Sequence, residues 1–313
     1  MPGEILTIVS EARFTLPSFA KINLTLRIHG RRADGYHEIE TVFQTVTLHD
    51  RLTFAARRDD DDERLELACD APDVPCDESN LVYRAGVALR ERYGIRGGAH
   101  ISLEKRIPAG GGLGGGSSNA AVALVGLARL WKIEADRHAL AGLGASLGAD
   151  VPFFLTGGTA LGTGRGTDIH PLADAPRKQL LVVTPGVRVS SAAAYKSLNA
   201  HALTKAVLPA NLAVSRAQAE ISGSLQASLK NDFEPVVYRL HPEIERARDA
   251  LATSGASGAL LSGSGASVFG LFENVEERDR AQASLRVEPG WQVFPCAMLS
   301  RSGYMGELGA VEF

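Results

Sequence analysis

Six glycines surround one leucine in the stretch Gly110-Gly111-Gly112-Leu113-Gly114-Gly115-Gly116-Ser117-Ser118-Asn119, the most informative segment of this chain. The apolar, alanine-rich run from Ala120 to Trp131 follows at once and predicts a helix. Glycine permits positive φ angles and lets a ligand approach the backbone closely. The first N–H groups of a helix lack partners within the helix, and the helix dipole adds partial positive charge there. The segment therefore predicts a loop that binds an anion, most often phosphate, at a helix N-terminus.

The glycine segment matches neither of two common nucleotide-binding motifs. A Walker A motif ends in Gly-Lys-Ser/Thr, whereas Gly116 is followed by Ser117 and Ser118. A dinucleotide fingerprint needs an acidic residue about 20 positions further on in a second strand, and Asp136 falls in a predicted helix–helix connection. We expect one serine to cap the helix, and Ser118 is a candidate contact to Mg²⁺ through Mg·ATP. A flexible connector or a plain helix cap is the alternative, although a cap needs one glycine at most.

Composition limits the class of protein. The chain has 313 residues, an apolar fraction of 45% and a net charge of −3, so buried cores are expected and a nucleic-acid surface is not. Cys69, Cys76 and Cys296 are odd in number and lack metal-like spacing, which indicates reduced thiols. The segment from Met1 to Arg13 lacks the pattern of a signal peptide, and no apolar run is long enough to span a bilayer. We expect a cytoplasmic protein without nucleic-acid or membrane contacts.

The pattern before the glycine segment predicts strands and then a helix. Phe19 to Ile28 alternates apolar and polar residues, as a half-buried strand does. Glu40 to Leu48 and Arg51 to Ala56 are further extended runs, and the acidic run Asp59 to Glu63 predicts a solvated loop. Ser79 to Tyr93 predicts a helix capped by Ser79.

The remaining elements alternate without a regular βαβ repeat, which favours an α+β fold over a doubly wound sheet. A polar, proline-containing link near Asp174 to Lys178 separates two predicted domains, residues 1–175 and 176–313. The predicted strands and helices are His100 to Lys105 (strand), Arg137 to Leu147 (helix), Gln179 to Val183 (strand), helical segments within Ser191 to Ser254, a strand–turn–strand in Ala259 to Phe272, Val275 to Leu285 (helix) and Trp291 to Pro295 (strand).

Two charged residues are candidates for catalysis. Lys21 has apolar neighbours in the first strand, although a lone strand lysine is more often at the surface. Asp150 follows the end of a predicted helix, where negative charge is disfavoured, so this carboxylate needs a partner elsewhere. A turn or capping aspartate is the alternative. If the fold brings the two together, they would suit phosphoryl transfer, in which a base lies beside the acceptor hydroxyl.

Two further segments could bind ligand. Tyr36 and His37 follow a turn, and an aromatic ring beside an imidazole could stack on a nucleobase and form hydrogen bonds with it. The alternative is a half-buried tyrosine beside a solvent-facing histidine. Leu261 to Ser267 is a glycine–serine turn, which could be an anion nest or only a tight hairpin.

Together these segments resemble the GHMP kinase superfamily, which includes galactokinase and the homoserine, mevalonate and phosphomevalonate kinases. Three motifs occur in the family order, at Pro17–Leu24, Pro108–Ala121 and Leu261–Gly265. Within the superfamily, the closest resemblance is to the kinases of 4-diphosphocytidyl-2-C-methyl-D-erythritol. Its most specific part is Arg32–Ile39, which contains Asp-Gly-Tyr-His-Glu, and Gly148–Phe154 also matches.

The resemblance implies an α+β fold with an N-terminal domain like domain 2 of ribosomal protein S5 and a ferredoxin-like C-terminal domain, with the site between them. It implies ATP-dependent phosphorylation of the acceptor's 2-hydroxyl in the non-mevalonate route to isoprenoid precursors, with Mg²⁺ and no tightly bound cofactor. Asp150 would be the base and Lys21 its charge partner. Asn23, Tyr36, His37, Gly263 and Ser264 would bind the acceptor with Asp150. The ATP site would contain Ser79, Asn80, Lys105, Pro108, Ala109, Gly110, Gly111, Gly112, Leu113, Gly114, Gly115, Gly116, Ser117 and Ser118.

Other functions stay open at this point. A related kinase could act on mevalonate or homoserine, although Tyr36 and His37 favour an acceptor that carries a nucleotide. A catalytically inactive ATP-binding regulator is disfavoured by the presence of both Lys21 and Asp150. A structural protein would use its glycines only as turns and would not bind ATP. The partners we expect are ATP and a small cytidine diphosphate sugar alcohol, and the protein could be a monomer or a homodimer.

Overall fold

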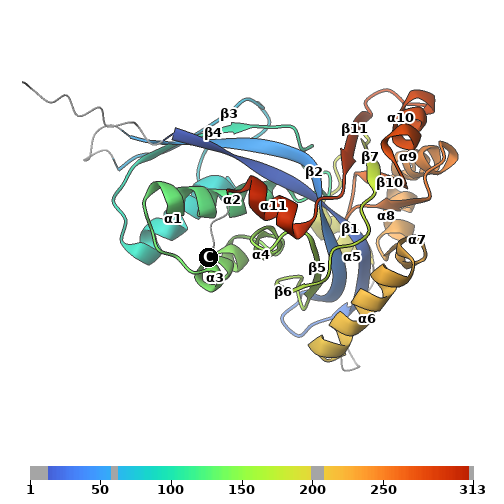
Figure 1. Ribbon diagram of the computed structural model, residues 1–313, viewed down its shortest axis with the longest axis horizontal. Coiled ribbons are helices and arrows are strands. Elements are labelled where there is room, and N and C mark those ends of the chain that lie inside the picture. Colours follow the sequence, from blue (N-terminus) through green and yellow to red (C-terminus); the bar gives the residue numbers. More distant parts are fainter. Residues whose placement is uncertain (1–12, 58–62, 199–207, 310–313) are drawn as a thin grey trace, which may run out of the picture.

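A computed structural model describes residues 13–57, 63–198 and 208–309. Within these ranges the chain forms two β-sheets with helices packed against them (Figure 1). The acidic run predicted to be a solvated loop lies outside the described residues, apart from Glu63. None of the helices in the described part is long and apolar enough to cross a membrane.

The first sheet is built on one long antiparallel pair, β1 (Arg13–Arg31) and β2 (His37–Ala56). The sheet has seven strands in the order β3-β4-β2-β1-β8, with β5 beside β2 and β6 beside β5. Lys21 and Asn23 lie on β1, and His37 is the first residue of β2. The other strands are β3 (Leu65–Cys69), β4 (Ala99–Glu104), β5 (Thr159–Thr163), β6 (Asp168–Pro171) and β8 (Lys230–Asn231).

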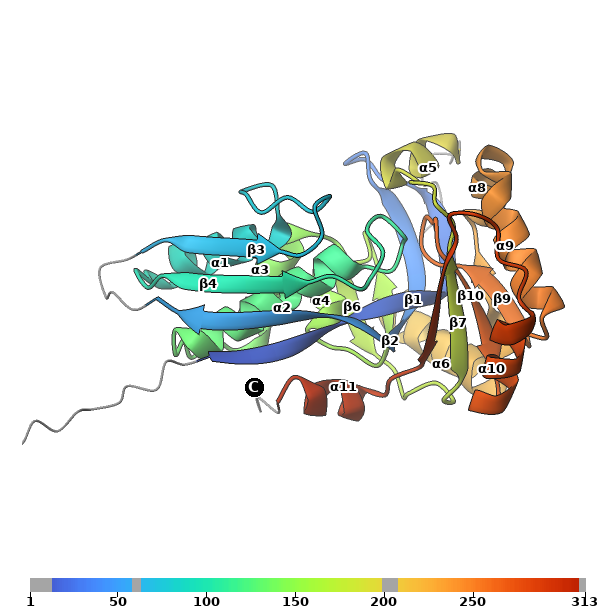
Figure 2. The same ribbon diagram turned by 90° about the horizontal axis from the view of Figure 1, so that it is seen from above.

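Helices α1 to α4 pack behind the first sheet (Figure 2). Helix α2 is apolar on nearly all sides and is buried from Ser118 to Ala128, because α1, α3, α4 and the sheet surround it. The last helix, α11, returns to this part of the molecule, where its Tyr304 ring is fully buried. The bounds are α1 (Leu81–Tyr93), α2 (Gly115–Leu130), α3 (Arg137–Leu147), α4 (Val151–Phe154) and α11 (Arg301–Glu307).

The second sheet has the strand order β11-β7-β10-β9. Its two faces are both apolar: Leu180 and Val182 of β7 face the core shared with β1 and α6, whereas Leu181 and Val183 face α8 and α9. This period of two explains why β7 reads as a continuous apolar run. The elements here are β7 (Gln179–Thr184), α5 (Ser191–Ser197), α6 (Ala210–Gly223), α7 (Leu225–Ser228), α8 (Glu234–Leu240), α9 (Pro242–Thr253), β9 (Gly258–Leu261), β10 (Val268–Phe272), α10 (Val275–Ser284) and β11 (Gln292–Ala297).

The predicted α+β class is confirmed, and several details are corrected. The first strand is longer than predicted, and the two runs from Glu40 to Ala56 form one strand. The short strands β3, β5 and β6 were not predicted from the sequence. Ser79 does not cap α1. Asn80 does, and its Oδ1 accepts from the amide of Val82. Both residue types cap helices well, so their order in the chain alone did not separate them.

The division at residue 175 stays a prediction. The link from Asp174 to Lys178 does lie between β6 and β7, where the chain passes from the first sheet to the second. Two elements beyond it nevertheless belong with the first sheet. Strand β8 pairs in parallel with β1, and α11 packs into the core under α2 and α4.

Candidate active site

The glycine segment forms a loop that enters the N-terminus of α2. Gly110, Gly112 and Gly114 have φ angles of 71°, 73° and 70°, which only glycine adopts readily. Gly114 is the N-cap and offers no side-chain hydrogen bond, so a serine cap was a wrong prediction. Ser117 and Ser118 lie in the first turn of the helix instead, because a left-handed glycine makes the turn that a capping side chain would otherwise fix. The first amides of α2 are therefore available to a ligand.

The turn between β9 and β10 supports this loop from the C-terminal half. The Ser262 hydroxyl donates to the carbonyl of Gly112 at 3.0 Å, and the Ser267 amide donates to the carbonyl of Gly111 at 3.0 Å. A Cβ placed on Gly112 would lie 2.2 Å from the carbonyl oxygen of Ser262. The predicted strand–turn–strand is thus present, and the turn lies against the glycine loop as its scaffold.

Lys21 and Asp150 lie side by side beneath the loop. The Lys21 side chain is only 4% exposed, and its Nζ lies 3.5 Å from Asp150 Oδ2. The same Nζ donates to Asn23 Oδ1 at 2.6 Å, and the Lys21 amide donates to the carbonyl of Leu113 at 2.9 Å. The fold therefore buries a lysine that the sequence alone would place at the surface. The Asp150 side chain is 32% exposed, so one side of the pair can be reached from solvent.

Gly263 and Ser264 reach the same place from the β9–β10 turn. A Cβ on Gly263 would lie 3.2 Å from Lys21 Nζ and 3.4 Å from Asn23 Oδ1. The Ser264 hydroxyl instead shares a hydrogen bond of 2.7 Å with Ser191 at the start of α5. Gly263 thus lies against the Lys21 ammonium, and its lack of a side chain keeps that place open. Ser264 connects the turn to α5.

A first pocket opens along the glycine loop. Asn80 lines it while its side chain caps α1, and Lys105 lines it while its ammonium pairs with the fully buried Asp50. Ser79 is held by Asp77 and is not part of the lining. Besides Asn80 and Lys105, the pocket is lined by Asp73, Val74, Pro75, Leu81, Leu103, Pro108, Ala109, Gly110, Gly111, Gly112, Leu113, Gly114, Gly115, Gly116, Ser117 and Asn119.

The two serines of the first turn face different ways. Ser117 lines the first pocket, whereas Ser118 is fully buried and its Oγ accepts from the hydroxyl of Ser18 at 2.8 Å. Ser117 is therefore the better placed of the two to contact Mg·ATP. Within the described ranges, no three His, Cys, Asp or Glu side chains cluster as a metal site. The residues present fit Mg²⁺ as an ion carried by phosphates, which keeps several waters and needs only one or two protein ligands.

A second pocket lies around Tyr36 and His37. The His37 ring stacks on the Tyr195 ring with centroids 4.8 Å apart, and the Arg165 guanidinium lies 3.7 Å from the centroid of the Tyr36 ring. The pocket is lined by Arg31, Gly35, Tyr36, His37, Ala149, Arg165, Ala192, Tyr195 and Lys196. Its charged lining residues are all cations, which suits a ligand with negative charge.

The surroundings of the second pocket shift the pKa of two of its side chains. Burial, and then the charge of Arg31, lower the pKa of His37 below its ordinary value, so the imidazole is neutral at pH 7. Burial, and then the negative charge of Asp150, raise the pKa of Tyr195 to about 12. Both rings therefore present uncharged faces and polar edges.

The two pockets meet at the segment that carries Asp150. Ala149 lines the second pocket. A Cβ on Gly148 would lie 3.7 Å from the hydroxyl of Ser117, which lines the first pocket. Asp150 and Lys21 thus lie where a group bound in one pocket could react with a group bound in the other. Tyr195 and Arg165 were missed as site residues, since only the folded chain brings them beside His37 and Tyr36.

Family models and related proteins match both halves of the chain. Residues 80–158 match the model described as "GHMP kinases N terminal domain", and residues 213–288 match "GHMP kinases C terminal". The chain is 42% identical to the 4-diphosphocytidyl-2-C-methyl-D-erythritol kinase of Prosthecochloris aestuarii over 87% of this chain and 93% of that protein. It is 40% identical to the enzyme of the same name from Moorella thermoacetica, over 92% and 98% of the two chains.

Solved structures share the fold. A crystal structure of a 4-(cytidine 5'-diphospho)-2C-methyl-D-erythritol kinase has a TM-score of 0.72 and 35% identity, over 91% of this chain and 99% of that one. The structure of L. major mevalonate kinase with R-mevalonate has a TM-score of 0.70 at 16% identity, over 93% and 97% of the two chains. At that identity the likeness extends to the fold alone.

Proposed function

Because this chain belongs to the GHMP kinases, and within them to the 4-diphosphocytidyl-2-C-methyl-D-erythritol kinases, we propose that Asp150 and Lys21 carry out its phosphoryl transfer. The protein is an ATP-dependent kinase of 4-diphosphocytidyl-2-C-methyl-D-erythritol. This acceptor is an intermediate of the non-mevalonate pathway to isoprenoid precursors. The proposal for the two residues rests mainly on one observation. Their ion pair lies between a glycine-lined pocket and a pocket of aromatic and cationic side chains.

The first pocket is the proposed ATP site. Phosphates would lie over Gly110 to Ser117, where the amides at the start of α2 and the helix dipole favour negative charge. Asn80 would lie near the adenine side, and Lys105, held by buried Asp50, would add positive charge. Ser117 would contact Mg²⁺ carried by the phosphates, and the ion would supply positive charge at this end of the site.

The second pocket is the proposed acceptor site. Tyr36 or Tyr195 would stack on the cytosine, and the neutral His37 ring would form hydrogen bonds with the polar edge of the base. Arg31, Arg165 and Lys196 would face the diphosphate of the acceptor. Homoserine and mevalonate each carry one carboxylate, whereas a diphosphate offers more negative charge to three cations, which supports the assignment of the cytidine diphosphate acceptor.

The proposed reaction is an in-line transfer to the 2-hydroxyl of the acceptor. The hydroxyl oxygen attacks the γ-phosphorus, the bond from that phosphorus to the β,γ-bridging oxygen breaks, and ADP leaves. Asp150 takes the hydroxyl proton as the new bond forms, and Lys21 stabilises the carboxylate and the developing charge. Asn23 orients the Lys21 ammonium, because its own amide group is held by Thr41. Gly263 leaves room beside this ammonium for the acceptor.

We also propose a cytoplasmic location, a monomer or a homodimer, and a functional division near residue 175. The support for this division is that the ATP pocket belongs to the first sheet and its helices, while α5 and the β9–β10 turn come from residues beyond 175. Substrates would thus be held between the two halves.

Replacing Asp150 with asparagine tests the central role. We expect Asp150→Asn to fold normally and to lose about 10²–10⁴-fold in kcat, the usual contribution of a general base. ATP binding, measured by calorimetry, should be nearly unchanged. A variant that keeps near-full turnover would remove Asp150 from the mechanism.

A further inference from the structure

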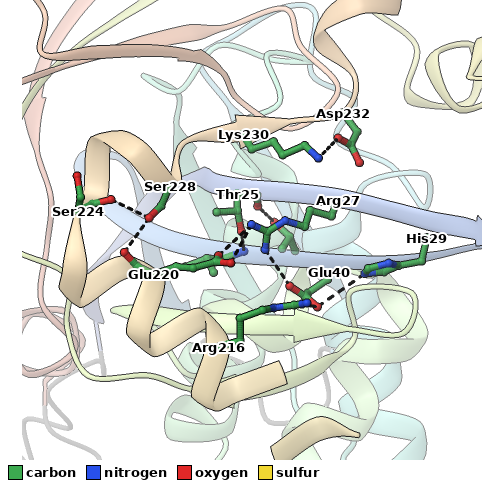
Figure 3. A network of polar contacts seen from close by, with 12 residues as sticks. Thr25, Arg27, His29, Glu40, Arg216, Glu220, Ser224, Ser228, Lys230 and Asp232 are labelled. Atoms are coloured by element: carbon green, nitrogen blue, oxygen red, sulfur yellow. Dashed lines mark hydrogen bonds and ion pairs between the residues drawn. The ribbon is translucent and has the colours of Figure 1, made fainter. Parts of the chain in front are cut away.

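A network of charged side chains joins α6 to the long β1–β2 pair (Figure 3). Arg27 of β1 lies directly opposite Glu40 of β2, and the two side chains form an ion pair of 3.2 Å. Arg216 of α6 also pairs with Glu40, and Glu220, one turn further along α6, accepts two hydrogen bonds from Arg27 at 3.0 and 3.1 Å. The four residues therefore alternate in charge across three elements.

Glu40 needs these partners because its side chain is buried. Glu40 is only 2% exposed, and a buried carboxylate costs free energy unless cations and hydrogen-bond donors surround it. Burial itself would raise the pKa of Glu40, but His29, Arg216 and Arg27 outweigh it and lower that pKa to about 2. Glu40 is thus ionised at every working pH, and α6 supplies one of its two arginines. We name Arg27, Glu40, Arg216 and Glu220 the α6 clamp.

The α6 clamp lies beside the apolar contact of the same helix. Ala213, Ala217 and Ile221 follow one another at four-residue spacing and pack into the core with Leu24 and Val42 of the sheet. Two of the three are alanines, and such small side chains set how close the helix comes but constrain its position along the strands only weakly. The paired charges fix that position, because an ion pair with hydrogen bonds depends on geometry.

The clamp is placed close to the proposed acceptor site along both strands. His37 precedes Glu40 by three residues on β2, and Arg31 follows Arg27 by four on β1. The opposite wall of the acceptor pocket, with Tyr195 and Lys196, belongs to α5, the helix that precedes α6 in the chain. The clamp thus fixes α6 to the strand pair that carries one wall of the acceptor pocket.

We propose that Arg216 and Glu220 are positioning residues for the acceptor, and that they act by holding the end of the β1–β2 pair, which carries Arg31 and His37. This inference rests on the proposed function for the identity of the acceptor. Arg216 and Glu220 line neither pocket, and their charged groups are directed at Glu40 and Arg27, so we assign them a positioning role and not a substrate contact. Their loss should weaken acceptor binding, while ATP binding at the other end of the site stays unchanged.

The test compares steady-state kinetics of Arg216→Met and Arg216→Lys with those of Arg246→Met. Arg246 pairs with Glu288 on the far side of the second sheet and controls for the loss of an ion pair as such. For Arg216→Met we expect KM for 4-diphosphocytidyl-2-C-methyl-D-erythritol to rise about tenfold, equivalent to 1.4 kcal/mol, with KM for ATP within about twofold. Arg216→Lys should restore part of the loss, and Arg246→Met should change neither constant.

A second readout does not depend on the acceptor. Amide hydrogen exchange at Ile28 and Ile39, which are hydrogen-bonded near the end of the strand pair, should become about tenfold faster in Arg216→Met and not in Arg246→Met. Unchanged exchange and an unchanged acceptor KM in a folded Arg216→Met protein would overturn the proposal. So would an equal rise in both KM values. If the wild-type protein did not phosphorylate this acceptor, the proposed function would fail. The exchange experiment would still test whether the α6 clamp holds the end of the strand pair.

Discussion

At the scale of single residues, the account depends on a buried lysine. A lysine in a strand is most often exposed, and the apolar neighbours Ala20 and Ile22 alone do not predict that Lys21 is buried. The fold buries it because the glycine loop lies over its backbone, and it compensates the charge with Asp150 and Asn23. Buried charges are retained only where they are paired and hydrogen-bonded, and this is why we propose a functional role for this pair.

Replacing Lys21 with alanine should lower kcat more than it changes either KM. We expect a loss of about 10²–10³-fold in kcat, the usual effect of removing one group that stabilises charge in the transition state. Lys178→Ala is the control, because Lys178 pairs with Glu273 beside the second sheet and lies in neither pocket. Steady-state kinetics measure both variants. A rise in KM with unchanged kcat would make Lys21 a binding residue only.

Residue patterns located this pair but not its neighbours. Lys21 and Asp150 could be selected from the sequence because each is a charged residue in an apolar context. Tyr195 could not, since it lies on a short helix with no motif of its own and reaches His37 only through the folded chain. The same holds for Arg216 and Glu40, which are 176 residues apart in the sequence.

At the scale of elements, the β9–β10 turn holds the glycine loop in its conformation. The sequence predicts a loop that binds phosphate at a helix N-terminus, and the structure adds two hydrogen bonds from Ser262 and Ser267 that hold its carbonyls. This support turns the amides at the start of α2 toward one place before any ligand arrives. Preorganised donors of this kind cost no reorganisation when the phosphates bind.

Gly112→Ala should push the glycine loop away from the β9–β10 turn. A Cβ there would lie 2.2 Å from the backbone oxygen of Ser262, which cannot rotate away, and the φ of 73° adds strain. We expect ATP affinity to fall at least about tenfold, because a small misplacement of a binding element has large effects. Gly142→Ala is a matched control in the interior of α3, since nothing lies within 4 Å of its Cβ position.

Calorimetric titration with ATP and thermal unfolding measure both glycine variants. Gly142→Ala should bind ATP normally and unfold at the same or a slightly higher temperature, because alanine favours helix. Normal ATP affinity in Gly112→Ala would contradict the role of the β9–β10 turn as the scaffold of the loop.

At the scale of the whole molecule, the two halves are joined by an apolar core and by the α6 clamp. The alternation of predicted strands and helices was enough to predict an α+β chain, because burial imposes the hydrophobic patterns of these elements. They did not predict that β8 and α11 return to the first sheet, because short elements carry weak local signals and are placed by long-range packing.

The clamp should make stability depend on pH in the acid range. The folded pKa of Glu40 is lowered from 4.5 to about 2, so its contribution is present above pH 4.5 and is lost as the pH falls toward 2. The whole shift corresponds to about 3 kcal/mol, of which about 2 kcal/mol would be lost by pH 3.

Urea denaturation of wild type and Glu40→Gln at pH 6 and pH 3 measures this contribution. We expect the difference in unfolding free energy between the two proteins to shrink by about 2 kcal/mol at the lower pH. A difference that is the same at both pH values would show that Glu40 is not held as an ion in the folded protein.

The most direct test of the central claim is ADP release measured with Mg·ATP and three acceptors in parallel: 4-diphosphocytidyl-2-C-methyl-D-erythritol, mevalonate and homoserine. The account predicts turnover with the cytidyl acceptor alone, and loss of that turnover in Asp150→Asn. Turnover with mevalonate or homoserine instead would keep the fold and contradict the acceptor. A folded protein that binds ATP but turns over none of the three would contradict the kinase itself.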